Sequence, residues 1–217
     1  MNRRRQAARM GVLLRPERDL WQRGYQRVAG VDEVGVGPLA GPVVAAAVVF
    51  PATARICGVD DSKIVRRAAR EQLVEAIYAQ ATAVGIGVVS VKDIDRLNIY
   101  HAALEAMRLA ILALSVEPDY LLVDARRVPG IDVPQLPLVK GDARSFSIAA
   151  ASIVAKVARD RMMVELDASY PHYGFAVNMG YGTKAHLEAI ERCGPCPVHR
   201  RSFAPVRQPR LPRLFVS

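Results

Sequence analysis

Apolar positions along the chain fall into short continuous blocks, which predict buried strands. These blocks predict strands over residues 28–34, 43–50, 84–91 (where Val and Ile alternate with Gly) and 120–124, and a shorter run over 136–139 has the length of an edge strand. A strand that follows a helix and is apolar throughout is typically parallel to its neighbour and buried on both faces. The pattern therefore predicts an α/β fold.

In the segments between these strands, the apolar residues recur at helical spacing. Residues 98–114 carry an apolar stripe and are followed by Pro118, as is typical of a helix end. Residues 145–168 present a face of small apolar side chains that suits close packing on a sheet. We expect helices over residues 65–83, 98–114, 145–168 and 183–192, with a short helical turn over 93–97.

Length and charge bound the domain organisation. With 217 residues, 51% of them hydrophobic, the chain can bury a complete core in one domain. Of a net charge of +9, residues 1–30 contribute eight Arg against two acidic residues, and residues 192–217 contribute six Arg against none. Cationic ends around a slightly acidic centre fit a protein that acts on a polyanion, although two solubilising tails would look the same. We predict a basic N-terminal tail over 1–27 with a short helix near 17–26, one domain over 28–206, and a basic C-terminal tail over 207–217.

Hydropathy and cysteine usage favour a soluble, cytoplasmic protein. No apolar run reaches the about 20 residues of a membrane helix, and three cysteines are too few for a disulfide framework. Cys193 and Cys196 form a Cys-x-x-Cys motif, with His199 three residues further on. The motif follows a helix instead of opening one, and it lacks a fourth zinc ligand, so we interpret it as a turn. A monomer is the default expectation.

Four carboxylates lie where apolar runs stop. Asp32 and Glu33 end the first run, Asp124 ends the fourth, and Asp142 follows the fifth. The carboxyl ends of parallel strands meet at one edge of a sheet, where sites collect. Crowded carboxylates are costly unless cations are present, and oxygen ligands select Mg²⁺ or Mn²⁺. Two alternatives stay open: strand ends with solvated acids, and a glycosidase pair, which leaves two acids unused.

Other residues point to a phosphate-bearing ligand. The glycine-rich stretch 35–41 would let a backbone or a phosphate approach closely. Lys63 precedes a helix, where the helix dipole disfavours a cation unless an anion arrives. Tyr173, Phe175 and Tyr181 could stack on a sugar or base, or could simply pack as a loop over the core.

Taken together, these pieces resemble the ribonuclease HII family, the type 2 ribonucleases H. Any one motif is weak, but seven occur in the order of the family across roughly residues 28–206. They are the run from Gly30 to Ala47 (Gly-Val-Asp-Glu-Val-Gly-Val-Gly-Pro at its start), Asp61-Ser-Lys63, Leu122-Val-Asp124, Lys140-Gly-Asp142 with Ser147–Lys156, Arg159-Asp-Arg161, Gly180-Tyr-Gly-Thr183 and His199-Arg-Arg-Ser-Phe203.

The resemblance implies a ribonuclease H-like fold, with a five-stranded mixed sheet flanked by helices and a small C-terminal helical part. It implies Mg²⁺- or Mn²⁺-dependent hydrolysis of the RNA strand of RNA–DNA hybrids. It also implies nicking 5′ of single ribonucleotides in duplex DNA, with 3′-hydroxyl and 5′-phosphate ends. By motif, the catalytic and metal-binding residues are Asp32, Glu33, Asp124 and Asp142, and the substrate-binding residues are Gly35, Val36 and Gly37 (backbone contact to the 2′-hydroxyl), Lys63 (phosphate) and Tyr181 (the junction sugar).

Three departures from the family pattern bear on substrate binding. The family usually has Arg at Val36, Gly at Ala125, and basic residues where Val177-Asn178-Met179 stand. Reading of the 2′-hydroxyl by the backbone survives the change at Val36, whereas phosphate contacts are lost. We therefore expect an active enzyme with weaker binding or altered substrate preference; the alternative is a nucleic-acid-binding protein with weakened or lost turnover. Asp160, between two arginines, is expected to form a structural ion pair.

Overall fold

A computed structural model describes residues 3–207 and contains one five-stranded sheet in the order β3-β2-β1-β4-β5. Strand β1 pairs antiparallel with β2, which pairs antiparallel with β3, while β4 runs parallel to both β1 and β5. The predicted mixed α/β sheet is therefore confirmed. The strands are β1 (Val28–Val34), β2 (Val43–Val49), β3 (Ala83–Val89), β4 (Tyr120–Asp124) and β5 (Gln135–Leu138).

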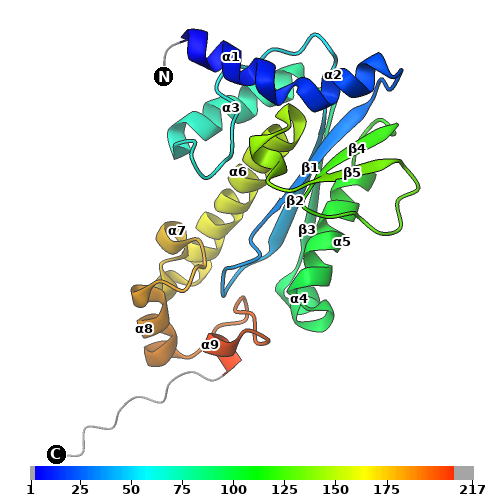
Figure 1. Cartoon of the computed structure of the whole chain (residues 1–217). Helices are drawn as coiled ribbons and strands as arrows, with labels where there is room; N and C mark the ends of the chain where they lie inside the picture. Colours follow the sequence, from blue (N-terminus) through cyan, green and yellow to red (C-terminus); the bar gives the residue numbers. More distant parts are fainter. Residues whose placement is uncertain (1–2, 208–217) are drawn as a thin grey trace, which may run out of the picture.

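Two helices sandwich the sheet, α5 on one face and α6 on the other (Figure 1). Side chains of β2 alternate between the two cores: Val43 and Ala45 pack on the α5 side, and Ala46 and Val48 pack on the α6 side with α3. Helix α6 approaches β1 so closely that a Cβ at Gly30 would lie 2.1 Å from the Ser147 carbonyl carbon. The helices of this central part are α3 (Arg67–Gln80), α4 (Val91–Leu97), α5 (Ile99–Leu112) and α6 (Phe146–Ser169). Each begins and ends within about three residues of the bounds expected from the sequence.

Residues 3–22, expected to be a basic tail with a short helix near 17–26, form two helices that pack on the domain. Helices α1 (Arg3–Leu13) and α2 (Arg15–Gln22) cross one end of α6 (Figure 1). Leu13 and Leu14 join the core on the α6 side, and Leu20 packs with residues of β1 and β4. The segment is rich in Arg, so its few apolar residues did not indicate a helical face that packs on the domain.

A small C-terminal part gathers at the other end of α6 (Figure 1). Its core is formed by Met163 of α6 together with Phe175 and Ile190. It contains η2 (Pro171–Tyr173), α7 (Phe175–Asn178), α8 (Lys184–Cys193) and α9 (Ala204–Arg207), while the short 3-10 turn η1 (Gly141–Ala143) lies before α6. The predicted C-terminal tail falls, beyond Arg207, outside the described residues. None of the described helices has the length and apolar character needed to cross a membrane.

Candidate active site

Three of the four predicted carboxylates form a tight group. The parallel register pairs Val31 of β1 with Val123 of β4, so Asp32 and Asp124 follow at the same edge of the sheet. One ligand oxygen from each of Asp32, Glu33 and Asp124 lies within 4.8 Å of the others. Asp32 is buried and Glu33 is half-buried. The structure thus brings the two strand ends together as the sequence predicted.

Asp142 lies beside this group but not within it. It belongs to η1, and the preceding Gly141 donates its backbone N–H to Asp124 Oδ1 at 2.6 Å. Asp142 Oδ2 is 3.7 Å from the ammonium nitrogen of Lys63, whose side chain is largely exposed. Asp142 is itself buried, so Lys63 alone extends from the solvent side toward the carboxylates.

The carboxylates destabilise one another's charged forms. Burial, followed by the charges of Glu33 and Asp124, raises the pKa of Asp32 well above its ordinary value. Burial and the charge of Asp124 likewise raise the pKa of Glu33, and burial with the charges of Asp61 and Asp124 raises that of Asp142. An oxygen-only group with this excess of negative charge fits a hard divalent cation such as Mg²⁺ or Mn²⁺.

Lys63 lies in a turn, not in the first turn of a helix. Helix α3 begins at Arg67, later than expected, and Asp61 Oδ1 accepts the backbone N–H of Lys63 at 2.8 Å. Ser62 is buried, and its hydroxyl bonds with that of Ser152 in α6 at 2.7 Å. The backbone of Lys63 is therefore held while its side chain extends over the carboxylates.

The glycine-rich loop and Tyr181 lie side by side. A Cβ at Gly37 would be 3.7 Å from the Tyr181 ring, and Tyr181 is 43% exposed. Tyr173 and Phe175 are buried and stack on each other, with ring centroids 5.5 Å apart. Of the three aromatic candidates only Tyr181 presents a surface to a ligand, and the alternative of a packed loop holds for the other two.

Comparison with known proteins agrees with this geometry. The family model described as Ribonuclease HII matches residues 29–206. The chain belongs to the ribonuclease HII family. It is 56% identical over 206 residues to a ribonuclease HII of Myxococcus xanthus, covering 94% of this chain and 70% of the relative. It is 58% identical over 196 residues to one of Geobacillus kaustophilus, covering 90% and 75%.

Solved structures show the same fold. The ribonuclease H2 of Pyrococcus horikoshii superposes with a TM-score of 0.72 at 28% identity, over 84% of this chain and 96% of the other. The family and the fold together identify the chain as an enzyme, an endonuclease of the ribonuclease H class.

Sequence reasoning missed several residues that support this ribonuclease H site. Arg9 in α1 makes two hydrogen bonds to Asp60, at 2.9 and 2.6 Å, and one to the carbonyl of Ala143 at 3.1 Å. Arg126 lies over the Tyr100 ring, 4.7 Å from its centroid, and partly offsets the rise in the pKa of Glu33. Neither contact follows from local spacing. The one available sequence signal for these contacts was Asp60, a carboxylate next to a predicted turn.

The expected ion pair of Asp160 forms, but not with its sequence neighbours. Lys156 contacts it at 2.6 Å and Arg70 at 3.4 Å. Arg161 instead pairs with Glu71, and Arg159 is turned into the protein interior. Asp160 therefore ties α6 to α3, away from the carboxylate group.

The Cys-x-x-Cys motif contributes to a hydrogen-bond relay and not to a metal site. Cys196 donates its backbone N–H to His199 Nδ1 at 3.1 Å, and the Nε2 atoms of His199 and His186 are 3.0 Å apart. His186 Nδ1 reaches the Tyr181 carbonyl at 2.8 Å. Because that carbonyl can only accept, both tautomers are fixed: His199 Nε2–H donates to His186, whose Nδ1–H donates to Tyr181. Both rings are buried, so the relay anchors the Tyr181 segment.

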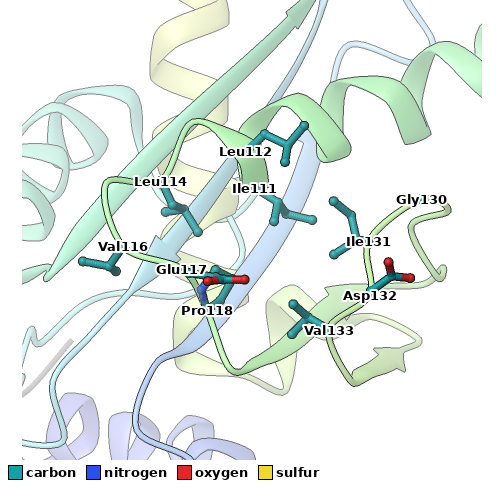
Figure 2. Close-up of a pocket in the computed structure, with 10 residues that line it drawn as sticks. All are labelled: Ile111, Leu112, Leu114, Val116, Glu117, Pro118, Gly130, Ile131, Asp132 and Val133. Atoms are coloured by element: carbon teal, nitrogen blue, oxygen red, sulfur yellow. The ribbon is translucent and has the colours of Figure 1, made fainter.

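A separate pocket lies at the opposite end of β4 (Figure 2). Its volume is about 420 Å³, and it is lined by the end of α5, the loop before β4 and residues 130–133. Pro118 lines it just before β4 begins, whereas Asp124 ends that strand at the carboxylate group. The pocket is therefore not part of the ribonuclease H site.

Proposed function

We propose that the chain hydrolyses the RNA strand of RNA–DNA hybrids and nicks duplex DNA on the 5′ side of embedded ribonucleotides. The products are 3′-hydroxyl and 5′-phosphate ends, and the cofactor is Mg²⁺ or Mn²⁺. The observation that carries this proposal is the group of carboxylate oxygens within 4.8 Å of one another, beside a glycine loop and an accessible tyrosine. Neither a sugar hydrolase nor a pure binding protein requires that combination.

The residues that would hold the metal are Asp32, Glu33, Asp124 and Asp142. A divalent cation bound there would neutralise the phosphodiester oxygens and lower the pKa of the attacking water. Asp32 and Asp142 are both buried and would supply ordered, desolvated ligands, and Lys63 would approach the cation site from the solvent side. The Gly141 N–H bond fixes the orientation of the Asp124 carboxylate before any metal arrives.

The substrate would lie across this edge. The 2′-hydroxyl is both donor and acceptor, so backbone groups of Gly35, Val36 and Gly37 can distinguish ribose from deoxyribose without reading a base. Tyr181, in contact range of Gly37, would stack on the adjacent sugar and test for a missing hydroxyl there. Lys63 would contact the phosphate from the rim.

Cleavage of defined substrates tests the proposal. A DNA duplex with one ribonucleotide, an RNA–DNA hybrid and an all-DNA duplex are incubated with enzyme in Mg²⁺ or Mn²⁺, and the product ends are analysed. We expect cuts in the first two only, and loss of cutting in Asp32→Asn. The control is Asp132→Asn, an identical change at an exposed residue of the distant pocket, which should leave activity intact.

Three results would refute the function. They are no cleavage by the wild type with either metal, cleavage of the all-DNA duplex, and full activity of Asp32→Asn. Tight binding of the ribonucleotide duplex without cleavage would support the alternative of a binding protein that has lost turnover.

A further inference from the structure

Two arginines are buried against the glycine loop with no carboxylate partner. Arg159 of α6 and Arg200 of the C-terminal part are both 0% exposed. Neither forms an ion pair within the part of the chain that the structure describes. All their hydrogen bonds go to backbone carbonyls, mostly those of residues 35–42.

The contacts of Arg200 join the start of the loop, at Gly35 and Val36, to its end at Gly41 and Pro42. It donates to the carbonyl of Gly35 at 2.6 Å, of Val36 at 3.2 Å and of Gly41 at 2.8 and 3.0 Å. A fork of five N–H donors can serve several carbonyls at once, which the single ammonium of a lysine cannot do in the same geometry.

Arg159 extends the same arrangement to the Tyr181 segment. It donates to the carbonyls of Ala40 at 3.1 Å, Pro42 at 3.0 Å and Met179 at 3.0 Å. Met179 comes two residues before Tyr181, so one guanidinium ties the loop to the tyrosine. Gly35, with φ of +95°, has no room for a side chain, because a Cβ there would lie 2.4 Å from Arg159 Nε.

Burial of two like charges side by side opposes folding. Burial, together with the charge of Arg159, lowers the pKa of Arg200 to about 9, so the guanidinium is still charged at neutral pH. A pair of apolar side chains would fill this space without desolvating any charge. Apolar side chains could not donate hydrogen bonds to the loop carbonyls, so these bonds are what the two arginines add.

Those contacts decide which way the loop's N–H groups point. In a trans peptide the C=O and N–H point in opposite directions, and no described peptide bond is cis. With the carbonyls of Gly35 and Val36 drawn inward, the N–H groups of Val36 and Gly37 point outward. No hydrogen bond among the described residues uses either N–H group. Two adjacent free donors thus face the solvent at the end of β1, next to the carboxylates.

We propose that Arg200 and Arg159 are positioning residues that present the Val36 and Gly37 amides as a fixed, polarised pair of donors for the ribose 2′-hydroxyl oxygen. A peptide whose carbonyl accepts from a cation is a stronger donor at its N–H, because hydrogen bonds in a chain polarise one another. This inference rests on the proposed function, since it concerns how that site recognises ribose.

Steady-state nicking kinetics test the inference in the intact enzyme. kcat and KM are measured on the duplex with one ribonucleotide, and the all-DNA duplex is added as a competitor to give its Ki. For Arg200→Lys we expect kcat/KM to fall about tenfold, the effect of one weakened hydrogen bond to a polar ligand. The Ki of the all-DNA duplex should stay within about twofold, because no ribose is recognised there. The control is Arg201→Lys, the same change at the exposed neighbouring residue, which should alter neither constant.

The inference is overturned if Arg200→Lys keeps the wild-type kcat/KM, or if the Ki rises in parallel with the loss. Amide resonances of Val36 and Gly37 in the wild type give a second measurement that needs no variant. They should shift on addition of the ribonucleotide duplex and not of the all-DNA duplex, and equal shifts would refute the role of these donors. A wild type that does not nick the ribonucleotide duplex would refute the proposed function instead.

Discussion

Replacement of Glu17 with alanine should destabilise the protein strongly, although this residue lies in the segment expected to be a tail. Glu17 is 2% exposed, and its Oε1 accepts three hydrogen bonds at the start of α6. The donors are the hydroxyls of Ser145 and Ser147, both at 2.6 Å, and the backbone N–H of Ser147 at 2.9 Å. A side chain from α2 thus caps the N-terminus of the longest helix, three residues after Asp142.

The expected loss can be worked from these contacts. A hydrogen bond to a charged acceptor contributes about 1.5–3 kcal/mol, and a buried donor left unpaired costs about 1–3 kcal/mol. The hydroxyls can partly reorient, and removal of a buried charge recovers part of the loss. We therefore expect Glu17→Ala to lower the free energy of unfolding by about 2–4 kcal/mol, against a typical total of about 5–15 kcal/mol.

Urea unfolding followed by circular dichroism measures this loss. The matched control is Glu191→Ala, which removes an exposed glutamate of α8 and should change the free energy of unfolding by less than about 0.5 kcal/mol. An equal, small effect of both substitutions would show that α2 does not hold α6, and would refute the role assigned to Glu17.

The pH dependence gives a second check with a definite sign. Burial raises the pKa of Glu17, although the bonds from Ser145 and Ser147 oppose the rise. The native state therefore binds this proton more tightly than the unfolded state does. Its contribution to stability is complete below the ordinary pKa and is lost as pH rises through the raised value. Relative to wild type, Glu17→Gln should gain stability as pH rises from about 4.5, so a constant difference would refute this assignment.

Four further predictions follow from the site. Arg9→Gln should raise the Mg²⁺ concentration for half-maximal cleavage a few-fold, measured by metal titration, because the segment holding Asp142 loses an anchor. Val36→Arg should tighten duplex binding and steepen its log–log salt dependence by about one unit, measured by fluorescence anisotropy at several salt concentrations. His199→Ala should lower the free energy of unfolding by about 1–3 kcal/mol and raise KM more than it changes kcat, since Tyr181 loses its relay. In metal-free buffer Asp32→Asn should raise Tm by relieving charge repulsion, and its further rise on addition of Mg²⁺ should be smaller than that of the wild type, measured by scanning calorimetry.

Strand ends were predictable because their signal is local. Each buried strand is a continuous apolar run, and a carboxylate that ends such a run lies at the end of the strand, where the sheet meets solvent. The parallel pairing of β1 with β4 then brings Asp32 and Asp124 together without further information. Asp142 lies beside them as predicted, but its position outside the tight group depends on the turn η1, which has no periodic signal.

The anchors could not be predicted because their partners are distant in sequence. Glu17 and Ser145 are separated by 128 residues, and Arg200 and Gly35 by 165. In composition, α1 and α2 resemble a solvated basic tail, and only tertiary docking distinguishes the two. Arg200 forms no ion pair with any residue in the described range 3–207, so charge patterning gave no indication that it is buried.

These anchors hold the shape of the site independently of any bound metal. Four carboxylates at one edge repel one another, and a site held together only by their common cation would open when the cation leaves. Here the loops that carry them are fixed by groups that do not touch the carboxylates: Glu17 at the start of α6, Arg9 at Ala143, and Arg200 at the glycine loop. The binding energy of metal and substrate is then not consumed in ordering these loops, because folding has already ordered them.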